Sequence, residues 1–325
     1  MLIVAGGAAY YYFVQRSKSR VPAEVAYVLP ASLTVVDTPA QIRIPVGTLK
    51  SGEQVEVLGR ARNWVQIRLP GGRTGWVEAA SLIDAQTYEG GQRLLKELAA
   101  LPPQAVGHTG NVANLRVEPS RDAPQLAQLP EKQRVEVFGR RLVEHPAEPG
   151  QAPTGPRVQD AWYLVRADSR AGWVLGRFVA LDIPEAISMY AQEVNLVAWL
   201  VLDTVDDNGR QMPQYLVADR VGTQECDFNH IRVFTWWKKR QEYVTAYVES
   251  NVNGYFPLKV ARINNVSYFR LRLVDEDGNK FQKVYGLFDT ITRPIGIVEG
   301  WESDAMPTQH ARKTRRVAAP RGHHR

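Results

Sequence analysis

Cysteine is almost absent from this sequence, since Cys226 is the only one in 325 residues. A single cysteine excludes an internal disulfide, so apolar cores must hold the fold together. The sequence also lacks a glycine-rich phosphate loop, a His-Glu-x-x-His motif and a Gly-x-Ser-x-Gly motif. These absences argue against several common enzyme classes, and we expect neither a cofactor nor a metal site.

Long apolar runs are also missing, and the most apolar segment is short. Residues 2–14 carry no charge, and Arg16, Lys18 and Arg20 follow them. This run is shorter than the roughly 20 residues that span a bilayer as a helix, and it lacks the basic start and clear cleavage site of a signal peptide. We expect residues 1–20 to be a membrane anchor or truncated signal segment that begins upstream of Met1. A buried N-terminal strand is the alternative, and the membrane orientation stays open.

The positive charge of the chain is confined to its ends. The formal net charge is +6, but residues 1–20 and 301–325 hold nine of the 40 basic residues and only two of the 34 acidic ones. The body from 21 to 300 therefore has 31 basic and 32 acidic residues. Nucleic acid is not an expected partner of a neutral body. The tail 301–325 is predicted to be disordered, either touching polyanions or serving as a solubilising end.

Three short blocks recur in the same order, which indicates an internal duplication. Each block alternates apolar and polar residues between Gly, Pro or Asn, as half-buried strands joined by tight turns do. The paired blocks are Gln54–Arg60 with Arg134–Arg140, Trp64–Arg68 with Trp162–Arg166, and Arg73–Val77 with Arg170–Val174.

The repeated blocks resemble the bacterial SH3 family. In that family a sequence like Asn114-Leu-Arg-Val-Glu-Pro-Ser120 opens the domain and a Gly-Trp-Val strand closes it. The opening of the first copy, Gln41-Ile-Arg-Ile-Pro45, is degenerate. The resemblance covers about 33–83 and 106–182 and implies two small barrels, but one small barrel hosts many functions, so it names no ligand.

The second copy carries an insertion. Val55 and Trp64 are nine residues apart, whereas Val135 and Trp162 are twenty-seven apart. The insert 141–158 is rich in Pro and Gly, which predicts an extended surface segment. It is either a specificity loop or an insertion that the fold tolerates.

A different pattern begins near residue 184. After a short helix at Glu185–Gln192, seven strands are predicted, with hairpin turns at Asp206–Gly209 and Asp275–Asn279. These strands are Leu196–Leu202, Tyr215–Val221, Ile231–Trp237, Glu242–Glu249, Leu258–Arg262, Tyr268–Val274 and Lys280–Leu287. Neither acidic turn supplies the ligand series of a calcium loop, so we interpret both as ordinary hairpins.

The sequence therefore predicts an all-β protein, with two small SH3-like barrels followed by a β-sandwich or barrel domain and short helical linkers. A helix at Tyr88–Leu101, stopped by Pro102 and Pro103, connects the barrels. The expected organisation is 1–20 anchor, 21–32 linker, 33–83 first barrel, 84–104 helical linker, 105–183 second barrel with the insert 141–158, 184–300 C-terminal β domain and 301–325 tail.

Aromatic residues are the best candidates for binding. Small barrels of this class present aromatic rows to extended ligands, so Trp64, Trp162 and Tyr163 are predicted to line a groove. Trp76 and Trp173 of the Gly-Trp-Val strands are predicted to be core residues. The run Trp236–Arg240 is interpreted as a strand end with solvated charges.

Catalysis is not expected. Modules of this family are often joined to cell-wall cysteine peptidases, but Cys226 has only His230 and the tail histidines after it. Four residues along a strand place two side chains roughly 13 Å apart, too far for a nucleophile and its base. Cys226 is therefore predicted to be a structural thiol.

Two functions from different classes remain open. The first is an envelope-associated binding protein, anchored in the membrane through residues 1–20 on the periplasmic face, that engages cell-wall peptide or partner proteins. The second is an intracellular scaffold whose basic ends touch nucleic acid or anionic membrane.

Overall fold

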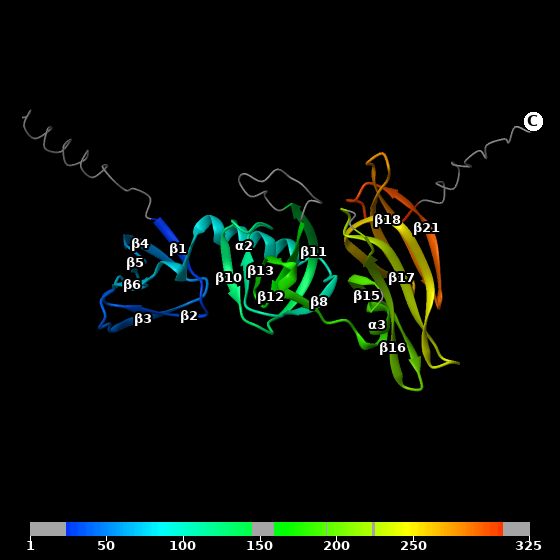
Figure 1. The fold of residues 1–325 in the computed structure, drawn as a ribbon, viewed down its shortest axis with the longest axis horizontal. Coiled ribbons are helices and arrows are strands. Elements are labelled where there is room, and N and C mark those ends of the chain that lie inside the picture. Colours follow the sequence, from blue (N-terminus) through cyan, green and yellow to red (C-terminus); the bar gives the residue numbers. More distant parts are fainter. Residues whose placement is uncertain (1–23, 145–158, 193, 223–224, 308–325) are drawn as a thin grey trace, which may run out of the picture. The chain divides into compact units, whose positions relative to one another are not determined.

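The computed structural model describes residues 24–144, 159–192, 194–222 and 225–307 (Figure 1). The described chain is almost entirely β-structure, as the sequence predicts, and it forms three antiparallel sheets of seven strands each. It divides into two compact units, the first built from residues 1–93 and 124–127 and the second from residues 94–123 and 128–325. The predicted anchor 1–20, most of the insert and residues 308–325 lie outside the described residues.

The first sheet is a small barrel. Its strands are β1 (Glu24–Val28), β2 (Ser32–Val36), β3 (Pro45–Lys50), β4 (Gln54–Ala61), β5 (Trp64–Arg68), β6 (Thr74–Glu78) and β7 (Leu82–Asp84), in the order β3-β2-β6-β5-β4-β1-β7, with the 3-10 turn η1 (Ala79–Ser81) before β7. Strict alternation places Val65 and Ile67 of β5 in its core, together with Val35, Val55 and Val77. The predicted linker 21–32 is wrong in part, because β1 lies within it and pairs with β4 and β7.

The second sheet repeats the first strand for strand. Its elements are β8 (Ala105–Thr109), β9 (Ala113–Arg116), β10 (Gln125–Leu129), β11 (Arg134–Glu144), β12 (Gln159–Ala167), β13 (Arg170–Leu175), η2 (Gly176–Phe178) and β14 (Val179–Leu181), in the order β10-β9-β13-β12-β11-β8-β14. Even the bulge recurs, at Val57/Gly59 in β4 and at Val137/Gly139 in β11. The duplication predicted from three blocks therefore extends over the whole barrel.

The glycine of each Gly-Trp-Val block is required by a close approach of two strands. A Cβ on Gly75 would lie 2.9 Å from the Val36 carbonyl oxygen, and one on Gly172 would lie 2.7 Å from the Arg116 carbonyl oxygen. Only a residue without a side chain lets β6 and β13 pass so near β2 and β9.

In the sequence, the helix α2 (Ala85–Leu98) follows the first barrel and precedes the second. Asp84 caps its start, accepting hydrogen bonds from the Thr87 backbone N–H at 2.8 Å and the Thr87 hydroxyl at 2.7 Å, and these bonds lower the pKa of the Asp84 carboxyl. The C-terminal half of α2 also packs on the second barrel. Leu94, Leu95 and Leu98 pack with the following Leu101 on residues of the second barrel, namely Phe138, Leu164 and Ala171.

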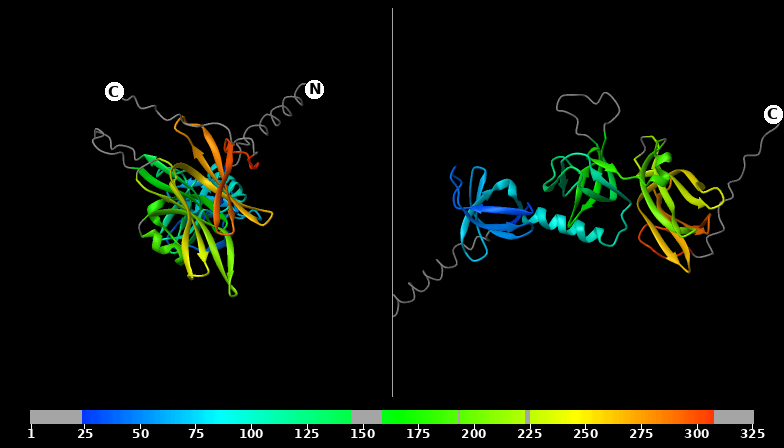
Figure 2. Two further views of the ribbon diagram at one scale, coloured as in Figure 1. Left: turned by 90° about the vertical axis from the view of Figure 1, so that its right-hand side faces the viewer. Right: turned by 90° about the horizontal axis from the view of Figure 1, so that it is seen from below.

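The third sheet is a meander, which follows the short helix α3 (Glu185–Ala191). Its strands pair in chain order: β15 (Asn195–Asp207), β16 (Arg210–Arg220), β17 (Phe228–Trp237), β18 (Glu242–Ile263), β19 (Val266–Val274), β20 (Lys280–Phe288) and β21 (Ile291–Glu299). The sheet curves strongly, so residues of β15 and β16 share one core with residues of β19 and β20 (Figures 1 and 2). On its other face, Ile187 of α3 packs with Tyr215 and Phe234.

Two predictions about the meander need correction. Glu242–Glu249 and Leu258–Arg262 belong to one 22-residue strand, β18, which bends through register shifts near its middle rather than stopping. Strand β21 was not predicted, because it carries Pro294 and exposed isoleucines and lacks regular alternation. Both predicted hairpin turns are confirmed, with Asn208, Gly209 and Gly278 at positive φ.

The beginning of the predicted tail is ordered against the sheet. The buried guanidinium of Arg270 donates to the Ala305 carbonyl at 2.9 Å and to the Asp304 carbonyl at 2.6 Å. Gln282 donates to the Ser303 carbonyl at 2.7 Å, and Lys259 pairs with the Asp304 carboxylate at 2.8 Å. Residues 301–307 therefore belong to the meander, because these donors of β18, β19 and β20 give their backbone and side chains fixed partners.

The second barrel and the meander are joined within one unit by Gln104, which is fully buried. Its side-chain amide donates to the Leu258 carbonyl at 3.2 Å and accepts from the Leu258 N–H at 2.6 Å. Its own carbonyl accepts from the Trp199 N–H at 2.8 Å. One residue immediately before β8 thus satisfies backbone groups of both β15 and β18.

Candidate functional site

The two tryptophans of the second barrel are both buried. Trp162 is 2% exposed and Trp173 is 8% exposed, and they pack together with Leu175, Leu94 and Val143. The prediction that Trp162 is an exposed groove residue is therefore wrong. The insertion lengthens β11, so Val143 pairs beyond the repeated block, while Leu94 of α2 adds a further cover.

The matching tryptophans of the first barrel, Trp64 and Trp76, are only half-buried. The guanidinium of Arg43 lies 4.6 Å from the Trp64 ring centroid, a cation–π contact. Trp76 pairs with Val36 and Gln66 but stands outside the buried core cluster of this barrel, so the prediction that it is a core residue is wrong. Trp64 remains a candidate for binding.

Tyr163 does not line an exposed groove with Trp162. Successive residues of a strand point to opposite faces, so its ring lies on the other side of β12. There burial raises the pKa of the Tyr163 phenol, while Arg140, which is hydrogen-bonded to it, and Arg220 oppose that rise. The residue therefore belongs to the side of the second barrel that faces the meander.

The groove that the second barrel does present is basic, and we name it the arginine groove. It is a depression of about 360 Å³ lined by Val112, Asn114, Arg116, Arg121, Gln128, Trp162, Leu175, Arg177 and Phe178. Three arginines line it and no acidic residue does. The buried residues Trp162 and Leu175 form its floor. Trp162, which the sequence predicted as a binding residue, therefore still borders a candidate site.

Each arginine of this groove is held in place by the barrel. Arg121 makes two bonds to the Asp160 carboxylate, at 2.9 and 3.2 Å, and Arg116 donates to the Ala123 carbonyl. The Arg177 guanidinium lies 5.0 Å from the Phe178 ring centroid. Fixed guanidinium groups beside apolar surface suit a ligand that carries carboxylates on an extended backbone.

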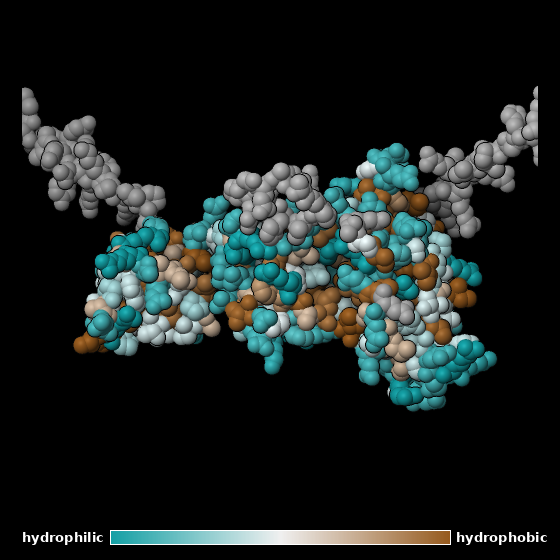
Figure 3. Space-filling view, viewed as in Figure 1, coloured by the Kyte–Doolittle hydropathy of each residue, from teal (hydrophilic) through white to brown (hydrophobic). Residues whose placement is uncertain are grey.

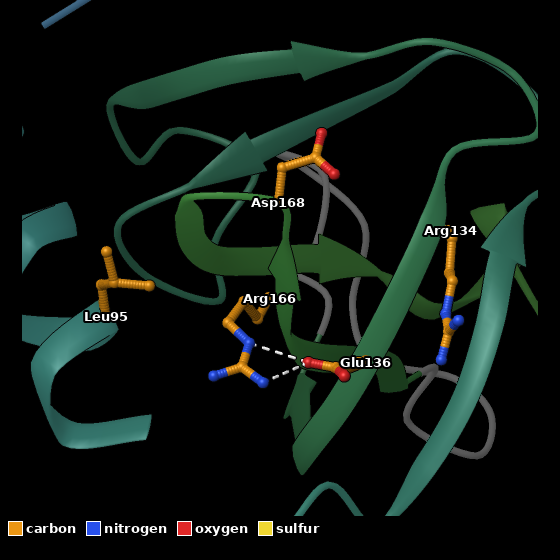
Figure 4. A pocket seen from close by; sticks show the side chains of 5 residues that line it. All are labelled: Leu95, Arg134, Glu136, Arg166 and Asp168. Carbon is orange, nitrogen blue, oxygen red and sulfur yellow. Dashed lines mark hydrogen bonds and ion pairs between the residues drawn. The ribbon is translucent and has the colours of Figure 1, made fainter. Parts of the chain in front are cut away.

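A second depression on this barrel is occupied by its own charges. It holds about 460 Å³ and is lined by Leu95, Arg134, Glu136, Arg166 and Asp168. Arg166 and Glu136 point toward one another across it (Figure 4), with Nε to Oε2 at 2.7 Å. Because its central charges already pair with each other, it offers less to a ligand than the arginine groove does.

Cys226 is buried, and burial raises the pKa of its thiol. His230 Nδ1 contacts the Asn229 side-chain oxygen at 2.9 Å and lies 3.8 Å from the Asp219 carboxylate, so other groups surround the nearest histidine in the chain. A buried thiol with a raised pKa is a poor nucleophile. Among the described residues there is also no group of three or more His, Cys, Asp or Glu side chains that could hold a metal ion.

The basic run at the end of β17 is a solvated turn. The Trp236 indole N–H donates to the Asp207 carboxylate at 2.8 Å, and Trp237 stacks under Arg240 at 4.3 Å. Lys238, Lys239 and Arg240 are exposed. Together with the hairpin between β15 and β16 they form a hydrophilic end of the meander, coloured teal at the lower right of Figure 3.

The bacterial SH3 domain family matches this chain twice, over residues 45–83 and 111–180. The chain therefore carries two tandem bacterial SH3-like domains, which confirms the resemblance predicted from the repeated blocks. Bacterial SH3 domains are binding modules for peptides or proteins, and many are related to the cell wall. No curated protein matches the sequence.

Three solved structures show a distant likeness. They are NlpC2 and NlpC1 from Trichomonas vaginalis, both at 10% identity, and an NlpC/P60 family protein from Bacillus cereus ATCC 10987 at 11% identity. They cover 72%, 72% and 70% of this chain and 99%, 95% and 94% of their own chains. Each TM-score is 0.19, so the likeness carries no argument about activity. No helix among the described residues is long and apolar enough to cross a membrane.

One carboxyl on the meander has a strongly shifted pKa. Burial raises the pKa of Asp227 to about 6, against the opposing influence of the Phe256 N–H and of Arg140, Arg220 and Arg141. The folded chain therefore binds this proton more tightly than the unfolded chain, whose Asp has a pKa near 3.8. It follows that the free energy of unfolding falls as the pH rises from about 4 to about 6, and stays lower above that range.

Asp227→Asn is expected to raise the free energy of unfolding at pH 8 by roughly 2 kcal/mol and to leave it little changed at pH 4. The asparagine side-chain oxygen can still accept the Phe256 N–H, which is bonded to Oδ2 at 2.9 Å in the native protein. Urea unfolding at both pH values measures the effect, with Asp122→Asn at an exposed position as the control. If the variant is no more stable than wild type at pH 8, the ionised Asp227 carboxylate does not destabilise the folded chain and the prediction is wrong.

Proposed function

We propose that this protein is a non-catalytic binding protein of the bacterial cell envelope, and that the arginine groove of its second SH3-like barrel binds cell-wall peptide. The observation that carries the proposal is the composition of the groove, three arginines beside Val112 and Phe178 with no acidic lining residue. Arg121 pairs with the Asp160 carboxylate next to the groove, whereas Arg116 and Arg177 contact a backbone carbonyl and an aromatic ring and keep their charge for a ligand. Cell-wall stem peptides are short, extended and rich in carboxylates. Guanidinium groups bind carboxylates through charge-assisted hydrogen bonds, and the apolar residues suit the alanine side chains between them.

The absence of catalysis is part of this proposal. Its support is the burial of Cys226 and the raised pKa of its thiol, because the thiolate is the reactive form of cysteine. The envelope location is likewise proposed, supported by the apolar run at residues 2–14 and by the binding modules themselves. The second module then adds avidity when both barrels engage one polymer.

Arg177→Gln is expected to weaken binding of a synthetic stem tetrapeptide with free carboxylates about five- to tenfold, because it removes one charge-assisted contact. Isothermal titration of the full chain measures the dissociation constant. Arg240→Gln is the matched control, since Arg240 is another exposed arginine stacked on an aromatic ring but lies on the meander. Its dissociation constant should equal that of wild type.

Three further results of this titration decide the proposal. The tetrapeptide with amidated carboxylates should bind at least tenfold more weakly, and mass spectrometry should recover both peptides intact. Cleavage of the peptide would overturn the non-catalytic assignment. A thymidine oligonucleotide that binds more tightly than the peptide, with the same loss in Arg177→Gln, would replace cell-wall peptide with a polyanion as the partner of this groove.

A further inference from the structure

A third cavity lies where β11 of the second barrel meets the meander within one compact unit. We call it the junction pocket. Its volume is about 520 Å³, and it is lined by Arg140, Arg141, Leu142, Glu144, Gln159, Glu225, Asp227, Tyr255, Phe256 and Trp301. Cavities of roughly 300–1,000 Å³ are typical of small-molecule sites. The buried hydrogen bonds of Gln104 to Leu258 fix its two sides relative to each other.

The junction pocket brings together charges of both signs that are not paired with each other. Arg140 and Arg141 come from the barrel, whereas Glu225 and Asp227 precede β17 of the meander. Within the described ranges, no ion pair joins either arginine to either of these two acids. Both arginines are still near enough to the Asp227 carboxyl to oppose the rise in its pKa that burial causes.

The charged groups are also held in position. Asp227 Oδ2 accepts the Phe256 N–H at 2.9 Å, and the Arg141 guanidinium lies 5.2 Å from the Trp173 ring centroid. Arg140 is hydrogen-bonded to Tyr163, yet its Nη1 atom is buried without a hydrogen-bond partner among the described residues. A buried donor with no acceptor is costly, and an acceptor on a ligand would satisfy it.

An aromatic wall completes the junction pocket. Tyr255 and Trp301 form a tilted ring pair with centroids 5.3 Å apart, and Phe256 follows Tyr255 in β18. Aromatic rings give apolar contact area to a ligand whose polar ends are bound elsewhere. A ligand that fills this pocket therefore needs a negative group, a positive group and an apolar surface.

We propose that the junction pocket binds a small zwitterion, a dipeptide or amino acid with both a free ammonium and a free carboxylate. The carboxylate meets Arg140, the ammonium meets Asp227 and Glu225, and an apolar side chain packs on Tyr255 and Trp301. A ligand with only negative charge would face the carboxylates of Glu144, Glu225 and Asp227, and one with only positive charge would face the arginines, so each is disfavoured. This site is separate from the arginine groove and does not depend on its function.

The experiment titrates the full chain with the dipeptide Ala-Phe, following heat and tryptophan fluorescence, and repeats the titration with the N-acetylated and the C-amidated dipeptide. Each blocked form should bind at least tenfold more weakly than the free form. Arg140→Gln should weaken the free dipeptide about tenfold. Asp227→Asn should abolish the preference for the free over the acetylated form while binding of the acetylated form persists.

Control variants separate this site from the groove and from misfolding. Arg177→Gln, in the arginine groove, should bind Ala-Phe as wild type does. Glu225→Gln at an exposed position is a second, independent test of the anionic wall. Wild type that binds blocked and free dipeptides equally, or binds none of them, overturns the proposal. Loss of Ala-Phe binding in Arg177→Gln would assign the dipeptide to the arginine groove and also overturns it.

Discussion

Replacing Gln104 by alanine is expected to lower the free energy of unfolding of the second barrel and meander by about 3–5 kcal/mol. The Gln104 side chain is the partner of both the N–H and the carbonyl of Leu258, and all of these groups are buried. Alanine leaves both backbone groups without partners, and each buried unsatisfied group costs roughly 1–3 kcal/mol. The cavity left by the amide adds to the loss.

Urea unfolding followed by far-ultraviolet circular dichroism measures this effect. Gln133→Ala is the matched control, because the Gln133 side chain makes only solvent-exposed hydrogen bonds, to Arg134 and Asp168. It should change stability by less than about 0.5 kcal/mol. Gln104→Met separates packing from hydrogen bonding, since it refills the space without restoring the bonds. If methionine recovers wild-type stability, the hydrogen bonds to Leu258 are not what joins the two parts.

Gln104→Ala should also change how the unit unfolds. Wild type should lose the second barrel and the meander in one transition, because β8, β15 and β18 share this residue. With the shared bonds removed, the two parts should unfold at different urea concentrations. A single transition in which the unfolding free energy depends on urea concentration as steeply as in wild type would contradict this prediction. The remaining contacts would then suffice to couple the second barrel to the meander.

Local sequence signals predicted much of this fold because the relevant physics is local. Alternation in Trp64–Arg68 predicted a half-buried strand, and in the structure Val65 and Ile67 are its buried residues. Asn208-Gly209 marked a turn that requires positive φ. The duplication then showed which strands correspond. The first strand of the first barrel, Glu24–Val28, was not predicted, because no repeated block contains it. Only its pairing with β4 and β7 shows that it belongs to the barrel.

Features that depend on distant partners were missed. Residues 301–307 look like the start of a charged tail, and only the donors Arg270 and Gln282 on the sheet give them a place. Gln104 is a polar residue after two prolines, with nothing in its neighbourhood to indicate a partner 154 residues away. The junction pocket was invisible for the same reason, because Arg141 and Asp227 come together only through the tertiary fold.

The tryptophans illustrate how tertiary context overrides a repeat. Trp64 and Trp162 occupy equivalent positions, yet Trp162 is buried and Trp64 is half-exposed. One cause lies within the block, because apolar Leu164 replaces Gln66 and packs in the cluster that holds Trp162. The extension of β11 and the approach of Leu94 cover the second ring, and neither feature is part of the repeat.

Trp173→Ala should therefore lower the free energy of unfolding by about 3–5 kcal/mol, the cost of deleting a large ring from a closed core. The ring is 8% exposed and packs with Trp162 and Leu175, and Arg141 stacks on it at 5.2 Å, so its removal also frees that guanidinium. Trp237→Ala in the same unit makes the same change at a ring that is 39% exposed and should cost less than about 1.5 kcal/mol. Both are measured by urea unfolding at pH 7. If Trp173→Ala stays as stable as Trp237→Ala, the ring is not a core element, and its face of β13 would have to be counted with the binding surface.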